Sequence, residues 1–363
     1  MASIAASSTQ VRVSELLTPF VLIDGVRLRR NILDMQQAVA GLGASLRPHF
    51  KTHRTTAIAE LQLEAGAIGL TVSTAAQLSA VRRDFDCPIL VSSLLQTDAS
   101  CGQRLDEAWS CGDVLFAIES DRSIDLLRRA LGPEAVPDVV IEVDAGCLRT
   151  GVRASQCGEV ARRAARAGCR VVGLFTYPGH AYLPGRSREA SEQEHDALEL
   201  GALELARAGF EPEHVSAGCT PTMPFARSGV VTEYRPGTYV FGDRQQLMLG
   251  SVDRSQVTLS VMATVVAVHG DRLVLDAGGK ALGRDAPRWL PGYGQLLDGS
   301  DALVTGLYDH HAVVESYAGP PLTVGDRVPI LPNNANSVMA LLRSAWLTED
   351  GELAEDLRPQ PDR

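Results

Sequence analysis

Lysine is almost absent from this chain of 363 residues: Lys51 and Lys280 are the only lysines among 34 lysine and arginine residues. Arginine replaces lysine wherever a solvated cation is enough, but its guanidinium stays protonated and cannot form a Schiff base. A lysine retained against this background suggests amine chemistry, with codon bias toward arginine as the alternative explanation. Lys51 comes first, because it lies in RPHFKTH, residues 47–53, at the end of a short apolar run.

Three further absences limit the class of protein. The net charge of −10 leaves no excess of basic residues to neutralise phosphates, which argues against a nucleic-acid surface. The seven cysteines are odd in number, scattered and without a Cys-x-x-Cys pair, so we expect reduced thiols and no disulfide framework or zinc ribbon. No stretch reaches about 18 uninterrupted apolar residues, and no basic start precedes an apolar segment. We therefore expect no membrane span, no export and a cytoplasmic location.

The pattern of apolar runs predicts two domains. In residues 19–250, short apolar runs alternate with segments of helical period, which indicates a (β/α)8 TIM barrel of parallel strands joined by helices. Residues 251–345 change to valine-rich runs separated by Gly, Asp and Pro, which predicts a C-terminal antiparallel β domain. We expect residues 1–18 to form a leading segment that packs with this domain, and residues 346–363 to form a loosely ordered tail.

Nine short segments are expected as strands of the barrel region. They are Phe20 to Ile23, Ser45 to Phe50, Ala67 to Val72, Pro88 to Val91, Val114 to Ile118, Val139 to Val143, Val171 to Thr176, His214 to Ser216 and Thr238 to Phe241. If residues 45–50 form a strand, Lys51 lies at its C-terminal end, where barrel enzymes assemble their sites. Nearby cations such as Arg47 or Arg54 would push a buried lysine toward its neutral, nucleophilic form.

Histidines flank Lys51 at positions 49 and 53. On a strand these two positions share a face, so both side chains could line one pocket. The alternative is that one histidine packs in the core and the other lies on a surface loop, and the residues alone leave both open.

Polar residues also follow three later strands. Arg149, in IEVDAGCLRTGV (residues 141–152), could pair with a phenolate or carboxylate, or be a surface cation. Tyr177 and His180, in YPGH, come after the next strand. SAGCTPT, residues 216–222, is a loop of small and hydroxyl residues, where barrels bind phosphate through backbone N–H groups and a short helix N-terminus. A plain small-residue turn is the alternative.

Together these segments resemble the fold-type III pyridoxal-phosphate enzymes, the alanine racemase-like group, and within it the D-threonine aldolase and D-serine dehydratase family. The resemblance runs from Thr18 to about Leu342. Its anchors are RPHFKTH (47–53), EVDAGCLRTG (142–151), YPGH (177–180), SAGCTPT (216–222), RPGTYVFGD (235–243) and DAGGKA (276–281).

The resemblance implies a cofactor and the residues that hold it. Lys51 would carry pyridoxal 5'-phosphate covalently, Arg149 would approach the ring hydroxyl beside Tyr177, and Tyr239 would lie near the pyridine nitrogen. A tyrosine there would leave the pyridine unprotonated and limit its use as an electron sink. The phosphate would bind to residues of the small-residue loop, namely Gly218, Cys219, Thr220 and Thr222. The resemblance also implies a head-to-tail homodimer whose partner completes each site with its β domain.

The sequence departs from the family at the metal site. In the aldolase and dehydratase branch, a histidine and, two residues later, a cysteine or aspartate hold a divalent metal near the substrate β-hydroxyl. Asn334 and Asn336 occupy these positions. Because neutral amides are weak ligands for zinc or manganese, we expect no metal there. The two asparagines could instead contact the substrate. A relocated site near His310 and His311 is a further alternative, although ordinary hydrogen bonding is favoured there.

These residues lead to one main hypothesis and two alternatives. The main hypothesis is a lyase that acts on a D-configured β-hydroxy amino acid, by aldol cleavage or dehydration. Without the metal, acid-base catalysis by His53, His180 or His311 would have to activate the β-hydroxyl. The first alternative is a metal-independent amino-acid racemase or epimerase, which needs no such activation. The second is a noncatalytic pyridoxal-phosphate carrier, against which the long β domain argues.

Overall fold

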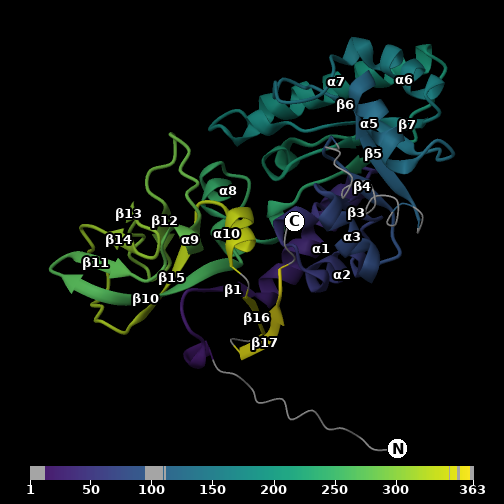
Figure 1. Cartoon of the computed structure of the whole chain (residues 1–363). Coiled ribbons are helices and arrows are strands. Elements are labelled where there is room, and N and C mark those ends of the chain that lie inside the picture. The colour runs from purple at the N-terminus through teal and green to yellow at the C-terminus, as the bar shows by residue number, and fades with distance from the viewer. Residues whose placement is uncertain (1–12, 95–108, 110–111, 343, 350–351, 360–363) are drawn as a thin grey trace, which may run out of the picture. The chain divides into compact units, whose positions relative to one another are not determined.

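The computed structural model describes residues 13–94, 109, 112–342, 344–349 and 352–359. The chain divides into two compact units (Figure 1). Residues 29–257 make up one, called here the barrel unit, and residues up to 28 together with 258–358 make up the other, called the β unit. The division at residues 257 and 258 lies close to the predicted one. No helix in the described ranges is long and apolar enough to cross a membrane.

The barrel unit is built on eight parallel strands in the order β2-β9-β8-β7-β6-β5-β4-β3. The two ends of this order meet, because Ile68 N donates to Leu46 O and Thr71 N to Pro48 O, both at 2.9 Å, and His49 forms a parallel bridge with Thr71. The sheet therefore closes on itself, and the predicted barrel is confirmed. Its strands are β2 Ser45–Leu46, β3 Leu70–Val72, β4 Ile89–Val91, β5 Val114–Ile118, β6 Asp138–Val143, β7 Arg170–Thr176, β8 His214–Ala217 and β9 Glu233–Tyr234.

Apolar side chains fill the barrel, as expected for a parallel sheet that is covered on both faces. All five residues of β5 are buried. One interior cluster draws on four neighbouring strands and consists of Leu90, Leu115, Ala117, Val140, Val172 and Phe175. Helices with a buried face follow most strands. They are α1 Gly25–Gly41, whose first four residues belong to the β unit, α2 Thr56–Glu64, α3 Ala75–Asp84, α5 Asp121–Leu131, α6 Cys157–Arg166, α7 Ser187–Arg207 and α8 Arg244–Met248.

Side-chain caps fix where several of these helices begin. The hydroxyls of Thr55, Thr74 and Ser120 accept backbone N–H groups at the starts of α2, α3 and α5. Short 3-10 turns follow the strand ends and carry much of the site described below. They are η2 Phe50–Thr52, η3 Ala154–Gln156, η4 Gly179–Tyr182, η5 Thr220–Phe225, η6 Thr238–Val240 and η7 Arg254–Gln256.

Three strand predictions for the barrel region need correction. The segment at Phe20 is a strand, but it pairs with strands of the β unit and not with the barrel. Thr238 to Phe241 was predicted as a strand and forms η6, while the eighth barrel strand is β9, which ends before Pro236. The strand at Ser45 stops at Leu46, and residues 50–52 turn into η2. β2 ends close to Pro48 and β9 ends close to Pro236. A proline has no N–H to donate to a neighbouring strand.

The β unit contains a largely antiparallel sheet, which confirms the predicted type of second domain; among its described residues, only β1 and β16 pair in parallel. Burial alternates along β10, as expected for strands with one face on the core. The strands are β1 Phe20–Asp24, β10 Leu259–His269, β11 Arg272–Leu275, β12 Gly294–Leu296, β13 Val304–Leu307, β14 Ala312–Val314, β15 Arg327–Pro332, β16 Ala345–Glu349 and β17 Glu352–Leu357. The helices are η1 Val13–Glu15, α9 Gly279–Leu282 and α10 Ala335–Leu341.

The ends of the chain differ in part from the prediction. The predicted loose tail contains β16 and β17, which pair with each other, and β16 also pairs with β1. At the other end, Arg327 donates to the carbonyl oxygens of Val13 and Leu16 at 2.7 and 2.8 Å, and Thr18 bonds to Thr264 at 2.6 Å. Residues 1–12 of the leading segment and residues 350–351 and 360–363 of the tail lie outside the described residues.

Candidate active site

Lys51 lies in η2, just beyond the C-terminal end of β2. Burial, together with the positive charges of Arg149 and Arg235, lowers the pKa of its ammonium group to about 8. Its Nζ lies 5.6 Å from the centroid of the Tyr177 ring. The amine is therefore neutral in about half of the molecules at pH 8 and in about a tenth of them at pH 7, and the neutral form is the nucleophile.

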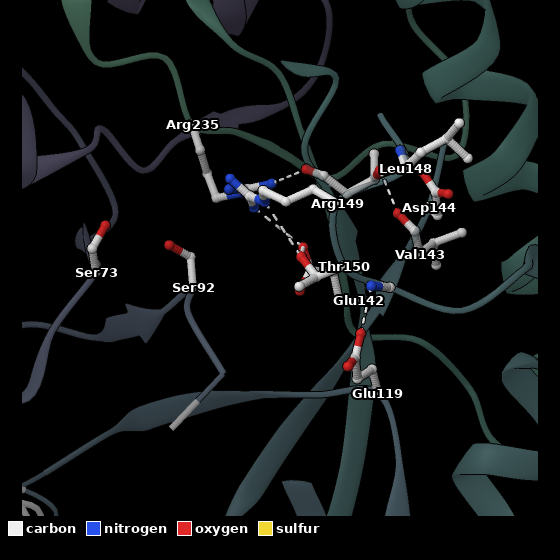
Figure 2. A network of polar contacts seen from close by, with 12 residues as sticks. Ser73, Ser92, Glu119, Glu142, Val143, Asp144, Leu148, Arg149, Thr150 and Arg235 are labelled. Carbon is white, nitrogen blue, oxygen red and sulfur yellow. Dashed lines mark hydrogen bonds and ion pairs between the residues drawn. The ribbon is translucent and has the colours of Figure 1, made fainter. Parts of the chain in front are cut away.

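Arg149 also lies against Tyr177, with its guanidinium carbon 4.6 Å from the ring centroid. The predicted residues Lys51, Arg149 and Tyr177 are thus brought together. Glu142, on β6, holds the arginine: its Oε1 lies 3.4 Å from Arg149 Nη2 and accepts a hydrogen bond from Thr150 Oγ1 at 2.7 Å (Figure 2). Arg149 therefore has a fixed place although half of its side chain is exposed.

Two more carboxylates shape the loop that carries Arg149. Glu119, just after β5, accepts the N–H of Gly151 at 2.5 Å, and Asp144 accepts those of Gly146 and Leu148 at 2.9 and 3.0 Å (Figure 2). The acidic residues in this stretch of sequence thus serve the backbone of the loop. Their contacts keep Arg149 over Tyr177.

Arg235 is a site residue that the sequence analysis did not single out. It follows β9 and is 4% exposed, and its Nε donates to Ser216 Oγ at 2.7 Å while its Nη2 donates to Thr176 O. Burial lowers its pKa, but a guanidinium remains charged at neutral pH. The only sequence signal was its place at the start of RPGTYVFGD, one of the family anchors.

His53 is a core residue of the barrel unit and not a free acid-base group. Its Nδ1 lies 3.2 Å from Thr55 O and 3.3 Å from Thr55 N, and its Nε2 lies 3.1 Å from Gln62 Oε1. Burial lowers its pKa to about 4, against these hydrogen bonds. Gln62 Nε2 in turn donates to the Tyr239 hydroxyl at 2.9 Å. The predicted catalytic role of His53 is therefore not supported, since both ring nitrogens are engaged.

His49 lies two residues before Lys51 and is also buried. Its Nε2 lies 3.4 Å from Ser73 Oγ and 3.3 Å from Ser92 Oγ, two hydroxyls that follow β3 and β4 (Figure 2 shows both serines). Burial, with the charges of Lys51 and Arg235, lowers its pKa well below the usual range, so the ring is neutral.

His180, in η4, is held by a chain of polar side chains on α7. Gln193 Nε2 donates to Glu189 Oε1 at 3.2 Å, which turns Gln193 Oε1 toward His180 Nε2 at 2.8 Å. Since this oxygen can only accept, the proton of the neutral ring lies on Nε2. The lone pair is then on Nδ1, a buried atom without a partner in the described ranges.

The small-residue loop after β8 has a specific geometry. Gly218 has φ +90°, and a Cβ there would lie 2.8 Å from Tyr234 Cδ1, so only glycine fits. The Cys219 N–H and the Thr222 hydroxyl bond at 3.1 Å, and Thr220 Oγ1 accepts the Tyr239 N–H at 3.1 Å. Burial raises the pKa of the Cys219 thiol to about 12, so it is neutral. The loop therefore offers backbone and hydroxyl groups and no negative charge of its own.

The predicted site residues of the β unit have different surroundings. Asn334 caps α10, with its side-chain oxygen accepting the Ser337 N–H at 3.3 Å, and Asn336 Oδ1 is buried without a partner in the described part of the chain. His310 and His311 are exposed, and His310 Nε2 lies 3.5 Å from Lys280 Nζ. No group of three or more His, Cys, Asp or Glu residues that could hold a metal occurs within the described residues.

The residues of the barrel unit fit a phosphorylated aldehyde cofactor. An amine with a lowered pKa, two guanidinium groups and a glycine that no other residue could replace are the groups that such a cofactor needs. The Tyr239 hydroxyl accepts from Gln62, which leaves its own proton to donate to a ring nitrogen. In the β unit, by contrast, the amides at 334 and 336 do not fit a divalent metal, because one is a helix cap and neither carries charge.

Comparison with known proteins bears on both units. The model of the alanine racemase N-terminal domain matches residues 23–245, and that of the putative serine dehydratase domain matches residues 258–347. D-threo-3-hydroxyaspartate dehydratase of Delftia sp. (strain HT23) is 31% identical over 349 residues, which cover 88% of this chain and 90% of that protein. Its solved structure superposes with a TM-score of 0.87 at 29% identity, covering 97% and 100% of the two chains.

Two further proteins are similar over most of their length. 3-Hydroxy-D-aspartate aldolase of Paracoccus denitrificans is 26% identical over 340 residues, which cover 89% of this chain and 86% of that one. The structure of D-threonine aldolase from Filomicrobium marinum has a TM-score of 0.88 at 22% identity, covering 97% of each chain, a likeness of fold alone. A cysteine-to-alanine variant of a D-threo-3-hydroxyaspartate dehydratase has been solved in a metal-free form.

Proposed function

The chain belongs to the alanine racemase-like, fold-type III family of pyridoxal-phosphate enzymes, and from this premise we propose that it is a lyase acting on a D-configured β-hydroxy amino acid. The observation that carries the proposal is the buried amine of Lys51, with its pKa lowered to about 8, beside Arg149 and Tyr177. The similarity to a dehydratase and an aldolase that are named for β-hydroxy D-amino acids supports the substrate class.

Lys51 Nζ is the proposed point of covalent attachment for pyridoxal phosphate. Arg149 would approach the ring hydroxyl, the Tyr239 phenol would donate to the ring nitrogen, and residues 218–222 would hold the phosphate. When bound, the cofactor supplies an electron-withdrawing ring that stabilises negative charge next to the substrate nitrogen. Burial raises the pKa of Tyr239, so its proton is retained and available for donation.

His180 is the proposed group that moves the proton of the β-hydroxyl. With Nε2 committed to Gln193, the Nδ1 lone pair can accept a proton from a hydroxyl at hydrogen-bond distance, or return one to a leaving hydroxyl. His311, which belongs to the β unit, stays a prediction for the same role. His53 does not enter the proposal, because Thr55 and Gln62 occupy its ring.

The proposed reaction uses no metal bound at positions 334 and 336. A lyase with a metal there would polarise the β-hydroxyl through the ion, whereas this chain would use hydrogen bonds and the His180 proton transfer. Asn336, whose side-chain oxygen lacks a partner in the described residues, is the proposed substrate contact. Racemisation remains the competing activity, because it needs no activation of the β-hydroxyl at all.

Product analysis in deuterium oxide tests the proposal. The holoenzyme is incubated with D-threonine, D-serine and D-threo-3-hydroxyaspartate, and the products are separated by chirality and mass. Dehydration gives a 2-oxo acid with ammonia, and aldol cleavage gives glycine with an aldehyde; either outcome is the expected one. Exchange of deuterium at Cα with an inverted amino acid, and no oxo acid or aldehyde, would instead identify a racemase.

A further inference from the structure

Glu194 is a fully buried carboxyl group on α7 that the proposed reaction does not use. Its Oε1 accepts the backbone N–H of Gly218 at 2.6 Å, so the carboxyl group lies directly behind the small-residue loop. Its Oε2 is buried and makes no hydrogen bond of good geometry within the described residues, although the Thr222 hydroxyl interacts with the carboxyl group. A buried ionised carboxylate with one unsatisfied oxygen is costly, and such a group is often neutral for that reason.

The hydrogen bond alone does not require an acid at this position. A glutamine would offer the same carbonyl oxygen to Gly218, and the buried face of α7 is otherwise made mostly of small or apolar residues such as Ala190 and Leu198. Unlike glutamine, glutamic acid can bind and release a proton at this position. Burial raises the pKa of Glu194 to about 7, while the Gly218 N–H, the charge of Arg235 and the Thr222 hydroxyl oppose the rise.

The surroundings contain few charges that could fix this carboxyl in one state. Arg235 and Tyr234 interact with it from β9 and the residue that follows, and Cys219 from the loop. Of these three, Arg235 alone is charged at neutral pH, and its Nε and Nη2 donate to Ser216 and Thr176. The other titratable groups on elements packed against α7 have partners of their own; they are His180 with Gln193, Tyr182 with Thr238, His214 with Glu233, and Glu142 with Thr150.

We propose that Glu194 is a positioning residue for the phosphate loop and that it takes up a proton when the cofactor phosphate binds there. This inference rests on the proposed function, which assigns the phosphate to residues 218–222. A phosphate dianion on one side of the loop and a carboxylate on the other repel each other in a medium of low dielectric constant. The protonated acid removes that repulsion and still accepts the Gly218 N–H through its carbonyl oxygen. The proton comes from solvent, and no covalent bond changes.

The linkage predicts how phosphate affinity depends on pH. Where Glu194 is already protonated, binding costs nothing extra; where it is ionised, each binding event must first protonate it. Affinity for a phosphorylated ligand should therefore fall by up to about tenfold per pH unit above the pKa of Glu194. A Glu194→Gln variant keeps the hydrogen bond and cannot ionise, so it should lack this dependence.

The experiment uses the full chain without cofactor and two probes that cannot react with Lys51. Pyridoxine 5'-phosphate carries an alcohol in place of the aldehyde, and pyridoxine lacks the phosphate as well. Dissociation constants are measured from pH 6 to 9 for wild type, Glu194→Gln and the exposed control Glu192→Gln on the same helix. We expect the ratio of wild-type to Glu194→Gln dissociation constants for pyridoxine 5'-phosphate to rise about tenfold per pH unit in the alkaline range. The control should follow wild type, and pyridoxine should show no change in this ratio.

Calorimetry in buffers of different ionisation enthalpy gives a second readout that needs no variant. Wild type at pH 8 should absorb close to one proton per bound pyridoxine 5'-phosphate. A ratio independent of pH, or binding without proton uptake by wild type, overturns the proposal even if Glu194→Gln folds poorly. Failure of the proposed function looks different: wild type would not bind pyridoxine 5'-phosphate at any pH and would form no adduct with pyridoxal phosphate.

Discussion

The two lysines of this chain lie in contrasting surroundings. Lys51 is packed in the barrel unit beside two arginines, and its pKa is lowered to about 8. Lys280, in the β unit, is 62% exposed and lies 3.7 Å from Asp309 Oδ2. The rarity of lysine points equally to both residues, whereas burial at the end of a barrel strand distinguishes one of them as a nucleophile. The rarity of lysine thus identifies two candidate residues, and the burial and neighbouring charges of each lysine determine whether it can act as a nucleophile.

The ion pairs of the two units differ in the same way. Arg47 and Glu233, in the barrel unit, are each 1% exposed and bonded at 2.9 Å, with Ser216 also donating to Glu233 at 2.7 Å. Arg284 and Asp309, in the β unit, are bonded at 2.7 Å but are more than half exposed. Distance alone would rank the second pair as the stronger. Because water screens the exposed pair, the buried pair should matter far more to stability.

Replacing each lysine in turn gives the largest expected contrast. Lys51→Ala should abolish the covalent cofactor adduct and reduce kcat by on the order of 10⁴ or more, since the covalent attachment point is lost. Lys280→Ala should form the adduct with the same absorbance and the same mass after borohydride reduction. The measurement is intact-protein mass spectrometry of the reduced holoenzymes. An unchanged adduct in Lys51→Ala would place the bond on another amine and refute the site.

Removing one partner of the buried ion pair is expected to have the next largest effect. Arg47→Met leaves the Glu233 carboxylate buried without its guanidinium partner, which should lower the free energy of unfolding by about 3 to 5 kcal/mol. Arg284→Met, the matched change at the exposed pair, should cost no more than about 1 kcal/mol. Urea unfolding at pH 7 measures both. Equal losses would show that burial does not separate the two units in the way described here.

The stabilisation that this buried ion pair contributes should decrease at acid pH. Burial alone would raise the pKa of Glu233, but the charge of Arg47 and the hydrogen bonds from His214, Arg47 and Ser216 outweigh it and hold the pKa well below its usual range. A carboxyl with a depressed pKa stabilises the fold above its unfolded pKa, and this contribution is lost as pH falls below that value. Arg47→Met should therefore lose less stability than wild type between pH 5 and pH 3.

The sequence predicts the architecture well, because the barrel follows from alternation of apolar runs with helical segments. It fails at residues whose role depends on where the chain turns. On the predicted strand, His49 and His53 share a face; in the structure the strand ends at Leu46, and η2 directs His53 to Gln62 while His49 stays beside Ser73 and Ser92. The alternative that one histidine is a core residue therefore holds for His53.

Arg235 and Glu194 show a second limit of the sequence. Both are ionisable residues whose burial is set by contacts between distant segments, such as Gly218 with α7. The sequence does contain one signal for Glu194, because this residue falls on the same helical stripe as Ala190, Leu198 and Leu205. A charged residue on an apolar stripe is the kind of exception that signals a function.

Substituting histidines separates an acid-base role from a structural one within the barrel unit. His180→Asn should reduce kcat by roughly 10²-fold or more, with the cofactor absorbance and the melting temperature little changed. His53→Asn should instead lower stability, because it breaks the chain from Thr55 through Gln62 to Tyr239. Steady-state kinetics and thermal unfolding of both variants give the comparison. Full activity in His180→Asn would show that another group transfers the proton, and His311 of the β unit would be the next residue to test.

The smallest expected effect is that of metal removal, and it tests the β unit directly. The Asn334 side-chain oxygen accepts the Ser337 N–H, and Asn336 carries no charge. A chelator should therefore change the activity of the holoenzyme by less than about twofold. Asn334→His combined with Asn336→Cys restores two ligating side chains, so this variant should retain zinc after dialysis, as elemental analysis would detect. It should also lose about 1 kcal/mol from the missing helix cap. A loss of wild-type activity on chelation, restored by added metal, would mean that charged donors outside positions 334 and 336 bind the ion.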